Sequence, residues 1–177
     1  AGKIRAYGLS NETPWGAMAH LRESAHSGHT RAVSIQNPYN LLNRSYEVGL
    51  AEISLRENIG LLAYSPLAFG LLSGKYRTKP WQPEWRIARY SRFTRYTKPQ
   101  GFAAVERYAQ IADQAGLSLT QMALAFVNSR PFVTANIIGA TTLDQLAENI
   151  ASIDITLSDD TLAAIDTIHA DISNPCP

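Results

Sequence analysis

The stretch Gly60-Leu61-Leu62-Ala63-Tyr64-Ser65-Pro66 decides the fold class of this chain. It is a short apolar run that follows a helix-breaking Asn58–Gly60 segment and ends at a proline, which predicts a buried strand running into a loop. The wider apolar segment, residues 59–72, is interrupted by Pro66 and Gly70. It falls short of the ~20 residues that a membrane-spanning helix needs, so we expect no membrane partner.

Similar strand-like runs rich in Ile, Val and Leu lie on both sides of this stretch. With residues 61–64 they make four, at residues 3–9, 32–35, 61–64 and 135–138, and helical periodicity follows each. Strands that alternate with helices predict an α/β fold of four βα units with parallel strands and right-handed crossovers. The pattern alone fits either a (βα) barrel or an open doubly wound sheet.

Capping residues place the helices between these strands. Thr13 and Pro14 predict a helix from residue 14 to about His26. A second helix is expected from residues 43–45 to Asn58, with four apolar residues facing inward: Val48, Ala51, Ile53 and Leu55. Later helices are expected at residues 102–114, 119–129 and 142–150 and after Ser158, with capping boxes formed by Ser118 with Gln121 and by Thr142 with Gln145.

Composition excludes several function classes. The 177 residues are 45% apolar, which predicts one compact domain over residues 1–177. Sixteen basic and fifteen acidic residues give no electrostatic case for a nucleic-acid partner. The single cysteine, Cys176, allows neither an internal disulfide nor a multi-cysteine metal site, so we predict no metal. The first residues read as a strand rather than a signal peptide, and we expect a cytoplasmic protein.

Polar residues follow each predicted strand, at the edge where parallel sheets bind ligands. Amide side chains such as Asn11 and Gln36 can orient a carboxamide, and Tyr64 offers a ring for stacking. Taken singly, such amides more often cap loops and such a tyrosine more often lies in a core. The segment at Thr142 opens a helix whose N–H groups suit a phosphate, a property that every helix N-terminus shares.

A long connection, residues 65–100, carries a cluster of positive charges: Lys75, Arg77, Arg86, Arg89, Arg92 and Arg95. A loop of this length is normally functional or disordered, and these cations either close over an anionic ligand or form a solvated basic surface. The chain contains no GxGxxG, Walker, GxSxG or HExxH motif. Any nucleotide cofactor must therefore be bound in another way.

Taken together, several segments occur in the order and spacing of aldo-keto reductases, and the chain resembles the C-terminal half of that family. The segments are Gly2–Asn11, Gln36–Asn40, Ala63–Leu67 and Gly139–Thr142. Residues 70–76 and 91–96 make the resemblance closest to the Tas-like branch and, more distantly, to potassium-channel β subunits. The resemblance implies that the four units are the last four of a (βα)8 barrel.

The resemblance also implies an NADP(H) site, described here from the nicotinamide end to the adenine end. Ser10, Asn11 and Gln36 resemble the residues that hold the carboxamide, and Tyr64 resembles the ring that stacks on the nicotinamide. Ser65, Leu67 and Gly70 match the pyrophosphate loop, Lys75 and Arg86 match cations near the adenosine phosphates, and Thr141, Gln145, Glu148 and Asn149 match positions around the 2′-phosphate and adenine. Some family members carry Lys and Arg at the positions of Gly139 and Gln145, so a preference for NADP(H) rests here on Lys75 and Arg86.

The family's catalytic aspartate, tyrosine, lysine and histidine belong to the first half of its barrel, which has no counterpart in this sequence. No catalytic residue is therefore predicted, and Tyr39 and Tyr64 are at most improvised proton donors. A barrel usually needs about 250 residues, so four units cannot close one and leave a strand without a pairing partner at each end of the sheet. We expect a homodimer to cover these edges. Three functions follow as hypotheses: an oxidoreductase half that acts on a small carbonyl substrate only when completed, a non-catalytic nucleotide-binding module, or an assembly domain with no ligand.

Overall fold

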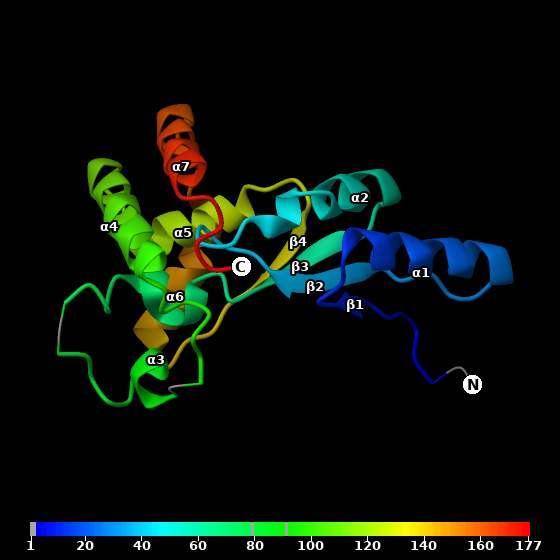
Figure 1. Cartoon of the computed structure of the whole chain (residues 1–177), viewed down its shortest axis with the longest axis horizontal. Coiled ribbons are helices and arrows are strands. Elements are labelled where there is room, and N and C mark those ends of the chain that lie inside the picture. Colours follow the sequence, from blue (N-terminus) through cyan, green and yellow to red (C-terminus); the bar gives the residue numbers. More distant parts are fainter. Residues whose placement is uncertain (1–2, 79, 91) are drawn as a thin grey trace.

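The computed structural model of the chain describes residues 3–78, 80–90 and 92–177; Gly2 and Ser91, which belong to the motifs quoted above, lie outside this part. Four parallel strands form one sheet in the order β1 (Leu9–Ser10), β2 (Ser34–Pro38), β3 (Gly60–Tyr64) and β4 (Val133–Ile137) (Figure 1). A helix follows each strand along the chain. The predicted α/β architecture of four βα units is confirmed, and it corresponds to half of a (βα)8 barrel.

The helices begin and end close to the capping residues. They are α1 (Pro14–Ser27), α2 (Leu50–Glu57), α3 (Arg86–Arg89), α4 (Pro99–Gln114), α5 (Leu119–Asn128), α6 (Leu143–Ala151) and α7 (Asp159–Asp171), with three short 3-10 helices, η1 (Ser45–Glu47), η2 (Ala68–Ser73) and η3 (Ser152–Asp154). Thr13 caps α1 by accepting a hydrogen bond from the Gly16 amide, and Ser118 and Gln121 form a full capping box on α5. Among the described residues, no helix is long and apolar enough to cross a membrane.

The first strand is shorter than the pattern of residues 3–9 predicts. Only Leu9 and Ser10 pair with β2, opposite Ile35 and Gln36. The partner strand begins at Ser34, and before it the Val33 amide donates to the Tyr7 carbonyl at 2.9 Å without the paired strand extending further. An apolar run alone therefore overestimates an edge strand, because strand length depends on the partner as well as on the sequence.

The inward face predicted for the second helix is confirmed in part, because Ala51 is buried and Ile53 packs partly buried against the core, while Val48 and Leu55 are not buried. Val48 is 74% exposed and Leu55 is 55% exposed, whereas Leu50 is buried. The helix does not begin at residues 43–45, because the chain first forms η1 and then passes through Gly49, whose φ of 93° lies in the left-handed region that glycine favours. The helix therefore begins at Leu50, which leaves Val48 outside it.

One face of the sheet is buried and the other is largely open. Ile35, Leu61 and Ala63 are fully buried on the face that the helices cover. Gln36 alternates with Ile35 along β2 and is exposed, as expected when successive residues point to opposite faces. The open face is the one that would line the interior of a closed barrel.

A buried ion-pair network holds the connection after β2 to the C-terminal helix. Arg44, whose side chain is 8% exposed, donates to both carboxylate oxygens of Glu47 at 2.8 and 2.9 Å and to Asp166 of α7 at 2.7 Å. The C-terminal segment joins this connection, because Asn174 accepts from the Arg44 amide and the Cys176 amide donates to the Leu42 carbonyl. These contacts fasten the last residues of the chain to its first half.

Candidate functional site at the carboxyl ends of the strands

The carboxyl ends of β1 and β2 bring three of the predicted residues together. Ser10 and Gln36 are partners in the β1–β2 register, so their side chains lie beside each other on the open face. The Asn11 amide donates to the Gln36 carbonyl at 3.0 Å, and Asn11 adopts a left-handed φ of 54° that turns the chain towards α1. All three side chains are exposed at this edge.

Tyr64, at the end of β3, reaches across to the same group. Its hydroxyl donates to Asn11 Oδ1 at 2.7 Å, and the Asn11 amide nitrogen lies 3.4 Å from Ser10 Oγ. The structure therefore joins Ser10, Asn11, Gln36 and Tyr64 into one polar cluster, although the sequence separates them by up to 54 positions. In this arrangement Asn11 already has a partner, while Gln36 keeps its amide free for a ligand.

Arg95 belongs to this cluster, although the sequence singled it out only as one of several loop cations. A hydrogen bond to the Tyr64 hydroxyl, with further contributions from Tyr96, raises the pKa of Arg95 above its usual value. Tyr96 is buried and its hydroxyl accepts from Asn40 at 3.1 Å. The far end of the long connection thus folds back onto the strand ends. Tyr64 and Arg95 are 31 positions apart, and no local sequence pattern predicts this contact.

The backbone that follows Tyr64 has an unusual run of left-handed residues. Ser65, Ala68, Phe69 and Gly70 have φ values of 54°, 49°, 58° and 91°. Turns of this kind can form concave sites for anions, but here the Ala68 amide donates to the Ser65 carbonyl at 2.9 Å. The Ser65 carbonyl accepts from Asn40 at 2.9 Å, which fixes the start of the segment. Leu67 and Gly70, the other predicted residues of this loop, are joined by a hydrogen bond of 2.8 Å between their backbones.

Lys75 lies directly over this loop. A Cβ atom added at Gly70 would meet Lys75 Cε at 3.1 Å and Nζ at 3.3 Å, so only glycine leaves the lysine this position. The ammonium group also lies 5.3 Å from the Tyr76 ring and 5.5 Å from the Trp85 ring. Burial lowers the pKa of Lys75. Burial disfavours the charged form of Lys75, and an anion on the loop would stabilise that form by pairing with the ammonium.

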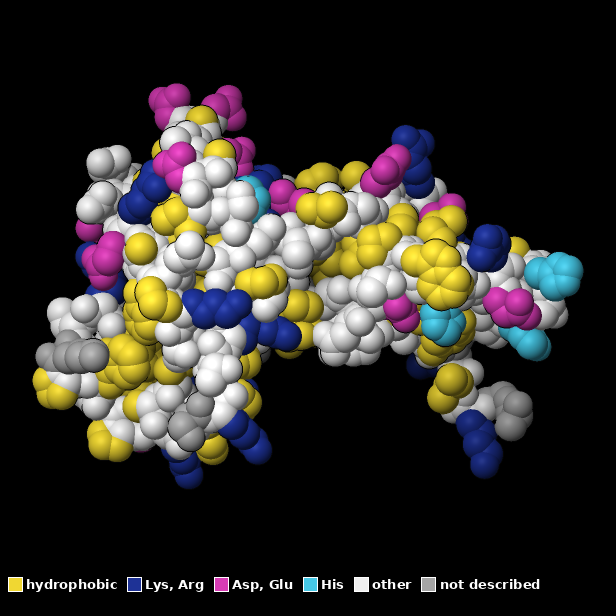
Figure 2. Space-filling model, viewed as in Figure 1, with side chains coloured by type: hydrophobic (Ala, Val, Ile, Leu, Met, Phe, Trp, Pro, Cys, Tyr) yellow, Lys and Arg dark blue, Asp and Glu magenta, His cyan; other side chains and the backbone are white. Residues whose placement is uncertain are grey.

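Arg86 is also held by aromatic rings rather than by carboxylates. Its guanidinium lies 4.8 Å from the Phe69 ring and 5.3 Å from the Phe93 ring, and these two rings contact each other. Basic side chains project from the lower part of the molecule below α3 in Figure 2. In the described part of the connection the Arg86 guanidinium thus packs on aromatic rings while its side chain stays exposed, and both interpretations of the loop cations stay predictions.

The four residues predicted for the adenine end lie around α6. The Gln145 carboxamide oxygen accepts from both the amide and the hydroxyl of Thr141, so the second half of the capping box expected at Thr142 is wrong. Glu148 accepts from the Ser118 hydroxyl at 2.5 Å, and the buried Asn149 donates to the Gly139 carbonyl at 3.2 Å. In the described part of the chain, no hydrogen bond joins these four residues to the strand-end cluster.

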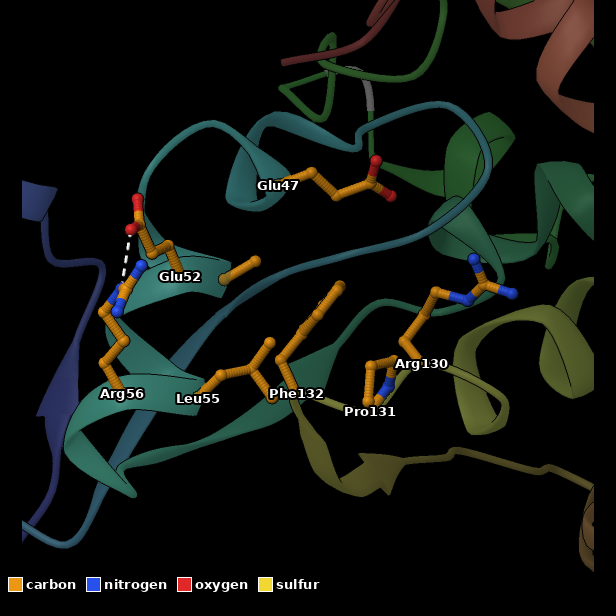
Figure 3. A pocket seen from close by; sticks show the side chains of 8 residues that line it. Glu47, Glu52, Leu55, Arg56, Arg130, Pro131 and Phe132 are labelled. Carbon is orange, nitrogen blue, oxygen red and sulfur yellow. Dashed lines mark hydrogen bonds and ion pairs between the residues drawn. The ribbon is translucent and has the colours of Figure 1, made fainter.

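A separate hollow lies between α2 and the residues before β4 (Figure 3). It has a volume of about 530 Å³ and an apolar floor that includes Leu55, Pro131 and Phe132. Glu52 and Arg56 on its rim pair with each other, as the dashed line in Figure 3 marks. None of the cofactor-site residues predicted from the sequence lines this hollow.

Comparison with known proteins decides the family. Residues 1–170 match the aldo/keto reductase family. The chain belongs to the aldo/keto reductases. It is 50% identical to "Protein tas" of Escherichia coli K12 over all 177 residues, which are 51% of that protein. It is 40% identical to "Aldo-keto reductase" of Babesia bovis over 84% of this chain and 54% of the relative, and 35% identical to "L-glyceraldehyde 3-phosphate reductase" of E. coli K12 over 77% and 41%.

This aldo/keto reductase chain spans about half the length of the curated relatives that it matches. The family typically uses a nicotinamide cofactor. The strand-end cluster offers amides and an aromatic ring, and the end of the Lys75 side chain lies against Gly70 of the left-handed loop. These residue types and this backbone fit a dinucleotide with a negatively charged centre.

Neither tyrosine considered as an improvised proton donor is free. Tyr39 is fully buried, its hydroxyl donates to Glu47 at 2.5 Å, and burial raises its pKa far above the usual range. Tyr64 is engaged with Asn11 and Arg95. Within residues 3–78, 80–90 and 92–177, no group of three or more His, Cys, Asp or Glu side chains is arranged to hold a metal ion.

Proposed function

We propose that this chain is the cofactor-binding half of an NADP(H)-dependent aldo/keto reductase. The observation that carries the proposal is the continuity of two sites. The amide and tyrosine cluster ends at Tyr64, and the left-handed anion-binding backbone begins at the next residue, Ser65. A cofactor whose nicotinamide lies at the strand-end cluster therefore places its pyrophosphate at the adjacent loop that begins at Ser65.

Each group has a role that its chemistry supports. Asn11 and Gln36 orient the carboxamide by donating and accepting hydrogen bonds, and the Tyr64 ring supplies a stacking surface. Lys75, which lies over the loop, holds the pyrophosphate, and Arg86 holds an adenosine phosphate. When bound, the cofactor supplies a hydride for carbonyl reduction. The residues of this chain bind and orient it.

Tyr64 and Asn11 must exchange partners when the carboxamide arrives. The hydroxyl of Tyr64 occupies the acceptor of Asn11, at 2.7 Å, that a carboxamide N–H would use. Arg95 holds the same hydroxyl and so keeps the tyrosine in place after the exchange. We therefore assign Arg95 as a positioning residue, which fixes the ring through the hydroxyl.

The substrate class is a small carbonyl compound, and turnover requires groups from outside this chain. One relative of 35% identity is named L-glyceraldehyde 3-phosphate reductase, which is a reductase of this substrate class. Reduction needs a proton donor beside the developing alkoxide, and the tyrosines near the cluster are engaged. Cofactor binding with no turnover by the isolated chain is the expected behaviour.

The test is a titration of the full chain with NADPH. Binding is measured by the quenching of the fluorescence of the three tryptophans and by energy transfer from them to the cofactor. Lys75→Met is expected to weaken binding on the order of tenfold by removing one charge-assisted contact. Arg56→Met is the matched control, because Arg56 is an exposed cation paired with Glu52 on α2. Parallel titration with NADH measures the preference for the 2′-phosphate.

The outcomes separate the three functions. Saturable binding that Lys75→Met weakens and Arg56→Met leaves unchanged supports the cofactor-binding half. Turnover of aldehydes by the isolated chain would show that it carries its own proton donor. No binding at millimolar NADPH, or equal loss in both variants, overturns the proposal and leaves an assembly domain.

A further inference from the structure

A chain of hydrogen bonds, here called the Asn128 network, links β4 to α5, η3 and α6. Asn136 of β4 donates to Asn128 Oδ1 at 3.0 Å, and Asn128 Nδ2 donates to Ser152 Oγ at 3.1 Å. The Ser152 hydroxyl donates to the Asn149 carbonyl at 2.7 Å, and Asn149 Nδ2 donates to the Gly139 carbonyl at 3.2 Å. The network therefore leaves the backbone at Asn136 and returns to it three positions later, just after β4.

The network is buried and not fully satisfied. Ser152 and Asn149 are 2% and 4% exposed. Asn136 Oδ1 is also buried and, among the described residues, has no hydrogen-bond partner. A buried polar atom without a partner lowers stability, and apolar side chains at these positions would avoid that loss. Buried polar networks fix one arrangement of the elements that they join. The geometry that this network imposes therefore explains it better than any stability that it adds.

The segment that the network holds carries residues predicted for the adenine end of the cofactor. Thr141 follows Gly139 closely and donates to the Gln145 carboxamide at 2.9 Å from its amide and 3.0 Å from its hydroxyl. Both Thr141 and Gln145 are exposed. They lie on the loop after β4 and on the first turn of α6, so their position relative to the sheet depends on how α6 and this loop are fixed.

Helix α5 fixes α6 at two separate places. Ser118, which caps the start of α5, donates to Glu148 at 2.5 Å. Asn128, the last residue of α5, donates to Ser152, which follows α6 directly. Because these contacts come from opposite ends of α5, together they fix the rotation of α6 about its own axis. A single contact would leave that rotation free.

We propose that Asn128 and Ser152 are positioning residues for the adenosine end of the cofactor. They act through Asn149, whose amide holds the Gly139 carbonyl and so sets the loop that carries Thr141. The amide of Asn149 is engaged inside the domain, so it acts on this loop rather than on the adenine. The assignment rests on the proposed function, because it needs a cofactor whose adenosine end lies at this loop.

The first test compares two buried serines that hold different parts of the fold. Ser152→Ala removes the hydroxyl at the centre of the network. Ser54→Ala is the matched control, because Ser54 is 4% exposed and its hydroxyl bonds to that of Tyr46 at 2.6 Å rather than to a predicted cofactor-site residue. Each variant loses one buried hydroxyl, so similar losses of stability are expected in urea unfolding.

The two variants are expected to differ in binding. The probe is adenosine 2′,5′-bisphosphate, which carries the adenosine end of NADPH without the nicotinamide, and its affinity is measured by isothermal titration calorimetry. Ser152→Ala is expected to raise the Kd roughly fivefold, about the net contribution of one hydrogen bond, and Ser54→Ala is expected to leave it unchanged. Loss of stability alone would not separate two variants of equal stability.

Hydrogen exchange measures the loop without any ligand. The Thr141 amide donates to the Gln145 side chain, and the Gln145 amide is also hydrogen bonded within this segment. Exchange of peptides that cover residues 139–146, measured by mass spectrometry, is expected to be faster in Ser152→Ala than in wild type and unchanged in Ser54→Ala.

Asn128→Leu breaks the network from α5 and is expected to act like Ser152→Ala in both measurements. Equal affinities for the bisphosphate in Ser152→Ala and Ser54→Ala, or unchanged exchange in Ser152→Ala, overturn the assignment. If wild type still binds NADPH in that case, the proposed function stands without it. If wild type binds neither NADPH nor the bisphosphate, the proposed function fails and the assignment fails with it.

Discussion

Replacing Arg44 with methionine tests the network that ties α7 to the connection after β2. The guanidinium makes three short hydrogen bonds, two to Glu47 and one to Asp166, and its side chain is 8% exposed. Loss of one partner from a buried ion pair costs about 3–5 kcal/mol because the other charge stays unpaired. Glu47 and Asp166 are 27% and 59% exposed, so water reaches both carboxylates and we lower this to about 2–3 kcal/mol.

The assay is urea unfolding followed by far-UV circular dichroism, at one fixed protein concentration. Arg44→Met is expected to lower the free energy of unfolding with no change in the slope, because the folded and unfolded surfaces stay similar. Arg56→Met is the control. Arg56 pairs with Glu52 at 2.7 Å, but both side chains are largely exposed, so the loss is expected within about 0.5 kcal/mol.

The reasoning would be refuted by an Arg44→Met variant as stable as wild type. It would also be refuted if Arg56→Met lost as much as Arg44→Met, because burial would then not decide the contribution of an ion pair in this fold.

Three further predictions follow from the site and the core. Gly70→Ala is expected to destabilise the chain by about 1–2 kcal/mol, measured by thermal unfolding, because alanine is strained at a φ of 91° and its Cβ displaces Lys75; an unchanged Tm would contradict the close approach. Tyr64→Phe and Arg95→Met both break the contact through which Arg95 fixes the ring, so both are expected to weaken NADPH binding by a similar factor of about three; an unchanged affinity in Tyr64→Phe would remove Arg95 as a positioning residue that acts through the hydroxyl. Burial raises the pKa of the Cys176 thiol to about 11, so the native protein is expected to react with iodoacetamide far more slowly at pH 8 than the urea-unfolded chain; equal rates would show that this thiol is accessible.

The sequence predicted the parts of the fold that local chemistry decides. Thr13 before Pro14 and Ser118 before Gln121 act within one helical turn, and both caps form as expected. The run at residues 60–64 is buried on the helix-covered face and forms β3 as predicted. The prediction for the second helix was wrong at Val48, because the backbone at Gly49 delays the start of the helix to Leu50, an effect that hydrophobic spacing does not reveal.

The candidate site divides in the same way. The order of the strand ends along the chain was enough to expect Ser10, Asn11, Gln36 and Tyr64 at one edge, and the register brings them together. The contact between Tyr64 and Arg95 could not be predicted from the sequence. It depends on how the aromatic residues of the long connection pack against one another. Long-range packing of this kind leaves no periodic trace in a sequence.

The tie between the C-terminal segment and the connection after β2 has a consequence for how the chain folds during synthesis. The Arg44 amide bonds to Asn174, 130 positions later, and the Leu42 carbonyl bonds to the Cys176 amide. Residues 174 and 176 leave the ribosome long after residues 42 and 44, so these bonds cannot form while the intervening units are being translated. The early units can pair with one another in the sheet as they are translated, but their tie to residues 174 and 176 forms only after all four βα units have been made.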